Sequence, residues 1–116
     1  MKDLKGRTAL VTGASAGLGL RVAKALAQEG MNLVVAARSA DALERVATEL
    51  RLLGVKAIAV PTDVSDEEQL RRLVDQTLTE FGSIDVLVNN AGIDAFCPFH
   101  EIDPARIQSV IQVNLT

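Results

Sequence analysis

Short apolar runs alternate along the chain with stretches in which apolar residues recur at helical spacing. The apolar runs are rich in branched aliphatic side chains, so they are expected to be buried strands. They are residues 8–12, 32–37, 56–60 and 85–89. The stretches between them place apolar residues three or four positions apart, which predicts amphipathic helices. These helices are expected at residues 18–30, 40–53 and 65–82.

Capping residues mark the starts of the third helix and of a fourth. Ser65, with Glu68 three residues later, forms a capping box that would satisfy backbone N–H groups at the start of the third helix. Asp103 followed by Pro104 predicts a fourth helix that runs to the end of the chain. The apolar face of this last helix would carry Ile107, Val110 and Ile111.

The resulting order of elements is β-α-β-α-β-α-β-α. Each connection between strands contains a helix, and a crossover of that length joins parallel strands. The pattern therefore predicts an α/β fold, half of a doubly wound parallel sheet with helices on both faces. No linker or repeat divides the chain, so residues 1–116 are expected to form one domain.

The glycine-rich segment at residues 13–19 fits two kinds of site. Residues 13–17 match G-x-S-x-G, which presents a nucleophilic Ser15 in hydrolases. Alternatively, Gly13 turns the chain sharply, and Gly17 and Gly19 remove side chains where phosphates approach a helix N-terminus. A hydrolase needs an earlier strand and a well-placed histidine, whereas His100 lies in an expected loop. The sequence therefore favours a dinucleotide phosphate site.

Four motifs in order strengthen this interpretation. They are Thr12-Gly13-Ala14-Ser15-Ala16-Gly17-Leu18-Gly19, Asp63-Val64, Asn89-Asn90-Ala91-Gly92 and Val113-Asn114-Leu115-Thr116. Together they resemble the short-chain dehydrogenase/reductase family over all 116 residues. The resemblance implies a Rossmann-like fold with four strands in the order 3-2-1-4. It also implies that this chain is the N-terminal, nucleotide-binding half of the fold.

The resemblance implies roles for individual residues as well. The pyrophosphate would be held by the glycine loop, namely Gly13, Ser15, Ala16, Gly17, Leu18 and Gly19. Asp63 and Val64 would meet the adenine. The ribose side would be lined by Asn90, Ala91 and Gly92. Asn114 matches the active-site asparagine of the family, and no metal is expected.

The end of the second strand predicts which dinucleotide is bound. Related folds place an acid there for the ribose hydroxyls, but this chain has Arg38 and Ser39. A guanidinium suits a 2′-phosphate through a charge-assisted contact of about 1.5–3 kcal/mol. Asp41 opposes this choice but lies inside the next helix, and position 16 lacks the second basic residue of some relatives. The prediction is NADP(H) over NAD(H), read by Arg38 and Ser39.

The resemblance also identifies what the chain lacks. Hydride transfer in the family needs a Tyr-x-x-x-Lys pair, and this sequence has no tyrosine. The chain is therefore expected to be the NADP(H)-binding half of an oxidoreductase acting on a carbonyl or alcohol, inactive alone. Two alternatives stay open: a non-enzymatic nucleotide-binding or self-assembly module, and an enzyme whose partner chain supplies the Tyr and Lys.

Charge and composition disfavour some classes of binding partner. A net charge of −3 with interspersed acids and bases argues against nucleic acid, and no apolar run reaches membrane-spanning length. The single cysteine, Cys97, suits a reducing cytoplasm. Without a fifth strand, residues 85–89 would leave an open apolar edge. The sequence therefore predicts homo-oligomers formed through residues 85–116.

Overall fold

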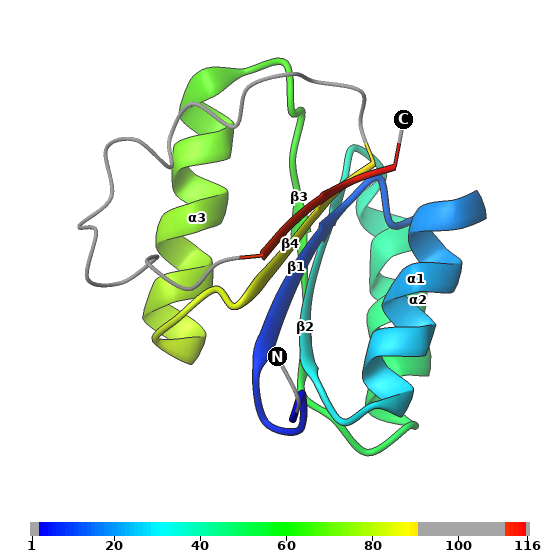
Figure 1. The fold of residues 1–116 in the computed structure, drawn as a ribbon. Coiled ribbons are helices and arrows are strands. Elements are labelled where there is room, and N and C mark those ends of the chain that lie inside the picture. The colour runs from blue at the N-terminus through cyan, green and yellow to red at the C-terminus, as the bar shows by residue number, and fades with distance from the viewer. Residues whose placement is uncertain (1–2, 91–110, 116) are drawn as a thin grey trace.

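Branched aliphatic residues build a parallel sheet that helices cover on both faces (Figure 1). The computed structural model describes residues 3–90 and 111–115. The strands are β1 (Thr8–Thr12), β2 (Asn32–Ala37), β3 (Ala57–Pro61), β4 (Val86–Asn89) and β5 (Ile111–Asn114). The helices are α1 (Gly17–Gln28), α2 (Ala40–Arg51) and α3 (Glu67–Phe81). The sheet order is β3-β2-β1-β4-β5, and every neighbouring pair is parallel.

Each central strand contributes side chains to two cores because successive residues point to opposite faces of a sheet. Ala9 and Val11 of β1 pack on the side of α1 and α2, whereas Leu10 packs on the side of α3. All three are fully buried. This double burial explains why the strand sequences are continuously apolar.

The last described segment corrects the sequence prediction. Residues 111–114 were expected in a helix with four strands in the sheet, but they form a fifth strand, β5, beside β4. The backbone N–H of Ile111 donates to the carbonyl oxygen of Asp85 at 2.9 Å, and that of Leu115 donates to the carbonyl oxygen of Asn89 at 3.1 Å. An unpaired apolar strand leaves a row of backbone groups without partners, and β5 satisfies them. The predicted helix start at Asp103 lies outside the described residues.

The start of α3 is the second correction. Asp66, not Ser65, caps the helix: its carboxylate accepts from the backbone N–H groups of Glu68 and Gln69. The backbone N–H and the hydroxyl of Ser65 donate instead to the side chain of Asp63, two residues earlier. A carboxylate at the N-cap also interacts favourably with the positive end of the helix dipole.

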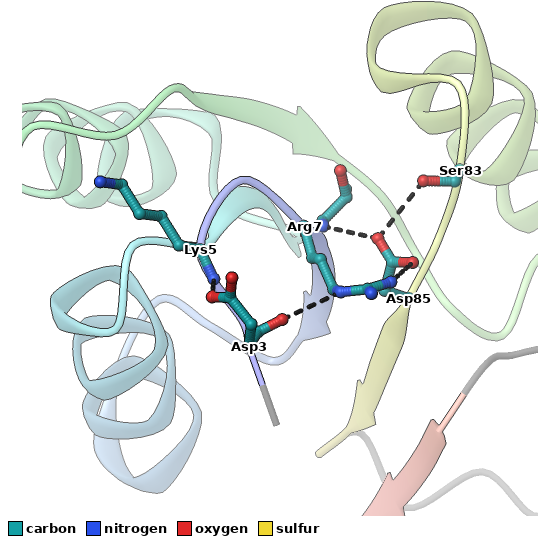
Figure 2. A network of polar contacts seen from close by, with 6 residues as sticks. Asp3, Lys5, Arg7, Ser83 and Asp85 are labelled. Atoms are coloured by element: carbon teal, nitrogen blue, oxygen red, sulfur yellow. Dashed lines mark hydrogen bonds and ion pairs between the residues drawn. The ribbon is translucent and has the colours of Figure 1, made fainter. Parts of the chain in front are cut away.

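A polar network fixes β1 to β4 at their amino ends (Figure 2). The carboxylate of Asp85 accepts from the backbone N–H of Thr8 at 2.8 Å and from Ser83 Oγ at 3.3 Å. Arg7 Nη1 lies 3.5 Å from the same carboxylate. This network helps to set the register of β1 against β4 at the end of β1 opposite the glycine-rich turn.

Candidate dinucleotide site

The glycine-rich turn leaves the carboxyl end of β1 and opens α1. Gly13 and Gly17 both have φ of +62°, a left-handed conformation that glycine adopts without strain. Ala16, which precedes the helix, has no side-chain group to cap it, and Ser15 is half-buried. Leu18 in the first turn is 43% exposed. The start of α1 is therefore exposed and has no side-chain cap, and a helix N-terminus of this kind suits a pyrophosphate.

The three glycines of the turn serve different purposes. A Cβ on Gly19 would collide with the carbonyl oxygen of Gly13 and with Nδ2 of Asn90. A Cβ on Gly13 would lie 3.0 Å from the same Nδ2 atom. No described atom lies within 4 Å of a Cβ placed on Gly17. The space beside Gly17 is therefore open, whereas Gly19, which was expected to face a phosphate, instead allows α1 to approach the turn itself.

Asn90, which follows the neighbouring strand β4, holds this turn through Thr12 at the end of β1 and through Gly13, contacts that the sequence did not predict. The backbone N–H of Asn90 donates to Thr12 Oγ1 at 3.1 Å, and Asn90 Nδ2 donates to the Gly13 carbonyl at 3.2 Å. Thr12 is fully buried, and its hydroxyl lies 3.4 Å from both the Val88 carbonyl and Asn89 Oδ1. A polar residue ending an apolar strand was the available signal.

Arg38 and Asp63 meet at the carboxyl ends of β2 and β3. Arg38 Nη2 lies 3.5 Å from Asp63 Oδ1, with the side chains 78% and 37% exposed. Ser39 caps α2, because its Oγ accepts from the backbone N–H of Ala42. Asp41 lies in the first turn of α2, as expected. Arg38 is therefore an accessible cation that lies beside a carboxylate.

Asp63 is held in a polar loop. Its Oδ1 accepts from Ser65 Oγ at 2.6 Å and from the Ser65 backbone N–H at 3.0 Å, while its own N–H donates to Gln69 Oε1. The Ser65 bonds, followed by the nearby Arg38 guanidinium, lower the pKa of the Asp63 carboxyl against an opposing effect of desolvation. Val64 beside it is half-buried against the core under α3.

The remaining predicted residues are placed only in part. Asn114 lies in β5, in register with Asn89, rather than on the face of a helix. Ala91, Gly92, Cys97 and His100 lie outside the described residues. Asn114 and Asn89 thus share the carboxyl end of the sheet with the glycine turn.

Other candidate sites are limited within the described ranges. A hollow of about 300 Å³ lies between the end of β3 and α3, away from the glycine turn. Residues 3–90 and 111–115 contain no group of three side chains suited to a metal ion. The helices described there are also too short or too polar to cross a membrane.

The chain is similar to known proteins in both sequence and fold. A family model described as short chain dehydrogenase covers residues 7–116. The ketoacyl reductase HetN of Nostoc sp. is 44% identical over 99% of this chain, which spans 40% of that protein. A short chain dehydrogenase/reductase from Burkholderia phymatum in complex with NAD is 41% identical, with a TM-score of 0.75 over 80% of this chain and 33% of its own. L-Sorbose reductase from Gluconobacter frateurii, complexed with NADPH and L-sorbose, is 38% identical, with a TM-score of 0.74 over 80% and 36%. The chain therefore spans less than half the length of these relatives.

Proposed function

The chain belongs to the short-chain dehydrogenase family of oxidoreductases, and we propose that it binds the cofactor for hydride exchange between NADP(H) and a carbonyl or alcohol substrate. The observation that carries this proposal is the uncapped start of α1 beside the left-handed Gly13 and Gly17. Backbone N–H groups there suit a pyrophosphate. When bound, the nicotinamide would supply the hydride donor or acceptor.

The preference for NADP(H) rests on Arg38. It follows β2 directly, is 78% exposed, and stands where related folds place an acid for the ribose. Solved relatives hold either NAD or NADPH, so the choice depends on this chain's own residues. A 2′-phosphate would gain a charge-assisted contact from the guanidinium.

Calorimetric titration with NADP⁺ and NAD⁺ tests this preference. Arg38→Ala is expected to weaken NADP⁺ binding by about tenfold or more, for a lost contact of about 1.5–3 kcal/mol, and to leave NAD⁺ binding unchanged. Arg45→Ala removes the same charge from an exposed position on α2 and is the matched control. Equal NADP⁺ affinity in Arg38→Ala and the unmodified chain would refute the assignment.

We also propose that these 116 residues do not catalyse the reaction alone, because the sequence has no tyrosine for the acid–base role that the family resemblance implies. Consumption of NADPH with a panel of carbonyl compounds is the test. Turnover by the purified chain would contradict the proposal. Turnover only after a second chain is added would support the alternative in which a partner supplies the catalytic pair.

Self-association is a separate proposal, and the exposed side of β5 favours it. Ile111 and Val113 are 42% and 38% exposed on this outermost strand. The open edge expected at residues 85–89 is covered, so the surface for a second copy would be β5. Light scattering at tens of micromolar should give more than the monomer mass, and Val113→Lys should restore the monomer. A monomer in the unmodified chain would rule this surface out.

A further inference from the structure

Arg38, the cation proposed to bind the 2′-phosphate, already lies beside the carboxylate of Asp63. Arg38 follows β2 and Asp63 follows the adjacent strand β3, and their Nη2 and Oδ1 atoms lie 3.5 Å apart. A phosphate that approached Arg38 would therefore meet a guanidinium shared with a carboxylate. It would also meet the negative charge of that carboxylate at close range.

Asp63 is not free to turn away from the arginine. Two donors of Ser65, its backbone N–H and its hydroxyl, hold Asp63 Oδ1 at 3.0 and 2.6 Å. The N–H of Asp63 is fixed by Gln69 Oε1 at 2.8 Å, and Gln69 Nε2 in turn donates to Asp66. The loop thus presents one carboxylate oxygen to Arg38 in a fixed position.

We propose that Asp63 is a specificity-determining residue that weakens binding of a 2′-phosphate by competing with it for Arg38. The inference rests on the proposed role of Arg38 in NADP(H) recognition. It predicts a moderate preference for NADP(H), which the Arg38–Asp63 pair sets, rather than the full preference of an unpaired arginine.

Competition outweighs any orienting benefit of the pair. The contact joins one nitrogen to one oxygen, and Arg38 is 78% exposed, so the pair does not lock the guanidinium in a single geometry. A carboxylate near a phosphate is repulsive whatever the geometry. Exposed ion pairs are worth up to about 1 kcal/mol, which corresponds to about a fivefold change in affinity.

The test compares adenosine 2′,5′-bisphosphate with 5′-AMP by calorimetry on the full chain. Their affinity ratio isolates the 2′-phosphate, because any loss of adenine binding affects both ligands. Asp63→Asn removes the charge, and its amide oxygen can still accept from Ser65. This substitution should raise the ratio about two- to fivefold, with the increase shrinking at high salt. The same ratio with NADP⁺ and NAD⁺ provides a second measurement.

Two further variants separate competition from general charge. In the Arg38→Ala background, Asp63→Asn should raise the ratio less, since only the direct repulsion between the carboxylate and the phosphate is then relieved. Asp75→Asn removes an equal charge from an exposed position within α3 and should leave the ratio near that of the unmodified chain.

The outcomes distinguish the two proposals. If Arg38→Ala leaves the ratio unchanged, the NADP(H) assignment itself is wrong. If Arg38→Ala lowers the ratio but Asp63→Asn does not raise it, Arg38 keeps its role and competition by Asp63 is refuted. An equal rise in Asp75→Asn would also overturn the inference. Circular dichroism of each variant confirms that the fold is retained.

Discussion

Asn90 Nδ2 donates a hydrogen bond to the carbonyl oxygen of Gly13 at 3.2 Å, across 77 positions of the sequence. The same amide nitrogen lies where a Cβ on Gly19 would intrude. The end of β4 therefore holds the turn after β1 and limits which residues α1 can carry there. The shape of the phosphate site depends on this packing as well as on the glycines.

Gly19→Ala is expected to damage both stability and binding. The added methyl group would press on backbone atoms of Gly13, which cannot move aside cheaply, so unfolding should become easier by about 1–3 kcal/mol. A shifted turn should also weaken NADP⁺ binding about tenfold, the equivalent of one charge-assisted hydrogen bond of about 1.5 kcal/mol. Urea denaturation and calorimetry measure the two effects.

Gly54→Ala is the matched control. Gly54 has φ of +94°, and no described atom lies within 4 Å of an added Cβ. Alanine there should cost about 1–2 kcal/mol of stability from backbone strain alone, and NADP⁺ binding should be unchanged. Normal NADP⁺ binding by Gly19→Ala would contradict the proposed link between this packing and the site.

Thr12→Val tests the buried hydroxyl under the turn. Valine has a similar shape but leaves the Asn90 N–H without its acceptor, which should cost about 1–3 kcal/mol. Thr12→Ser keeps the hydroxyl and loses one methyl group, for about 0.8 kcal/mol. Urea denaturation should therefore give a higher free energy of unfolding for Thr12→Ser than for Thr12→Val. The reverse order would show that side-chain shape matters more here than the hydrogen bond.

The strands and helices before residue 90 were predictable because their patterns are local. Continuous apolar runs and helical spacing placed the first four strands and three helices within a few residues of their observed bounds. The segment at 111–114 was not, because Ile111 continues the helical spacing of Ile107 and Val110 and also alternates with Val113 as in an edge strand. The backbone groups of β4, distant in sequence, decide between them.

The sequence supplies the candidate residues of the proposed site but not their contacts. The glycines and Arg38 stand out in the sequence, whereas the bonds of Asn90 to Thr12 and Gly13 depend on β1 and β4 being neighbours. The capping box at Ser65 and Glu68 was a plausible local pattern. It was wrong because Asp66, one position later, caps the helix and Ser65 bonds to Asp63.

Ser65→Ala should raise the pKa of Asp63 toward its ordinary value of 3.8, because the Ser65 hydroxyl bond is the largest cause of the lowered value. Arg38→Ala should raise the pKa of Asp63 less, since the guanidinium is a smaller cause. Titration of the Asp63 carboxyl by NMR measures both shifts. A larger shift in Arg38→Ala than in Ser65→Ala would refute this order.

The same pKa predicts how stability depends on pH. Because the pKa of Asp63 is lower in the folded chain than in the unfolded chain, its ionised form stabilises the fold above pH 3.8. That contribution is lost as the pH falls through the lowered pKa. The stability difference between the unmodified chain and Ser65→Ala should therefore be greatest near neutral pH and shrink in acid. A difference that stays constant with pH would indicate a loss unrelated to ionisation.

The other edge of the sheet, β3, carries features that oppose pairing with a second chain. Lys56 and Thr62 bond toward β2, so the alternation of a parallel strand points the backbone groups of Ala57 and Pro61 outward. Arg51 Nε donates to the Ala57 carbonyl at 2.9 Å, and Pro61 has no N–H to offer. Both features remove groups that an incoming strand would use.

Arg51→Ala should therefore promote association along β3. Light scattering of this variant should rise with concentration above the curve of the unmodified chain, because the Ala57 carbonyl becomes available to another strand. Adding Pro61→Ala, which restores an outward N–H, should raise it further. Arg45→Ala removes the same charge from the same helix and should follow the unmodified chain. If Arg45→Ala and Arg51→Ala associate equally, the lost charge would explain the effect. The proposal that Arg51 prevents strand pairing by occupying the Ala57 carbonyl would then be wrong.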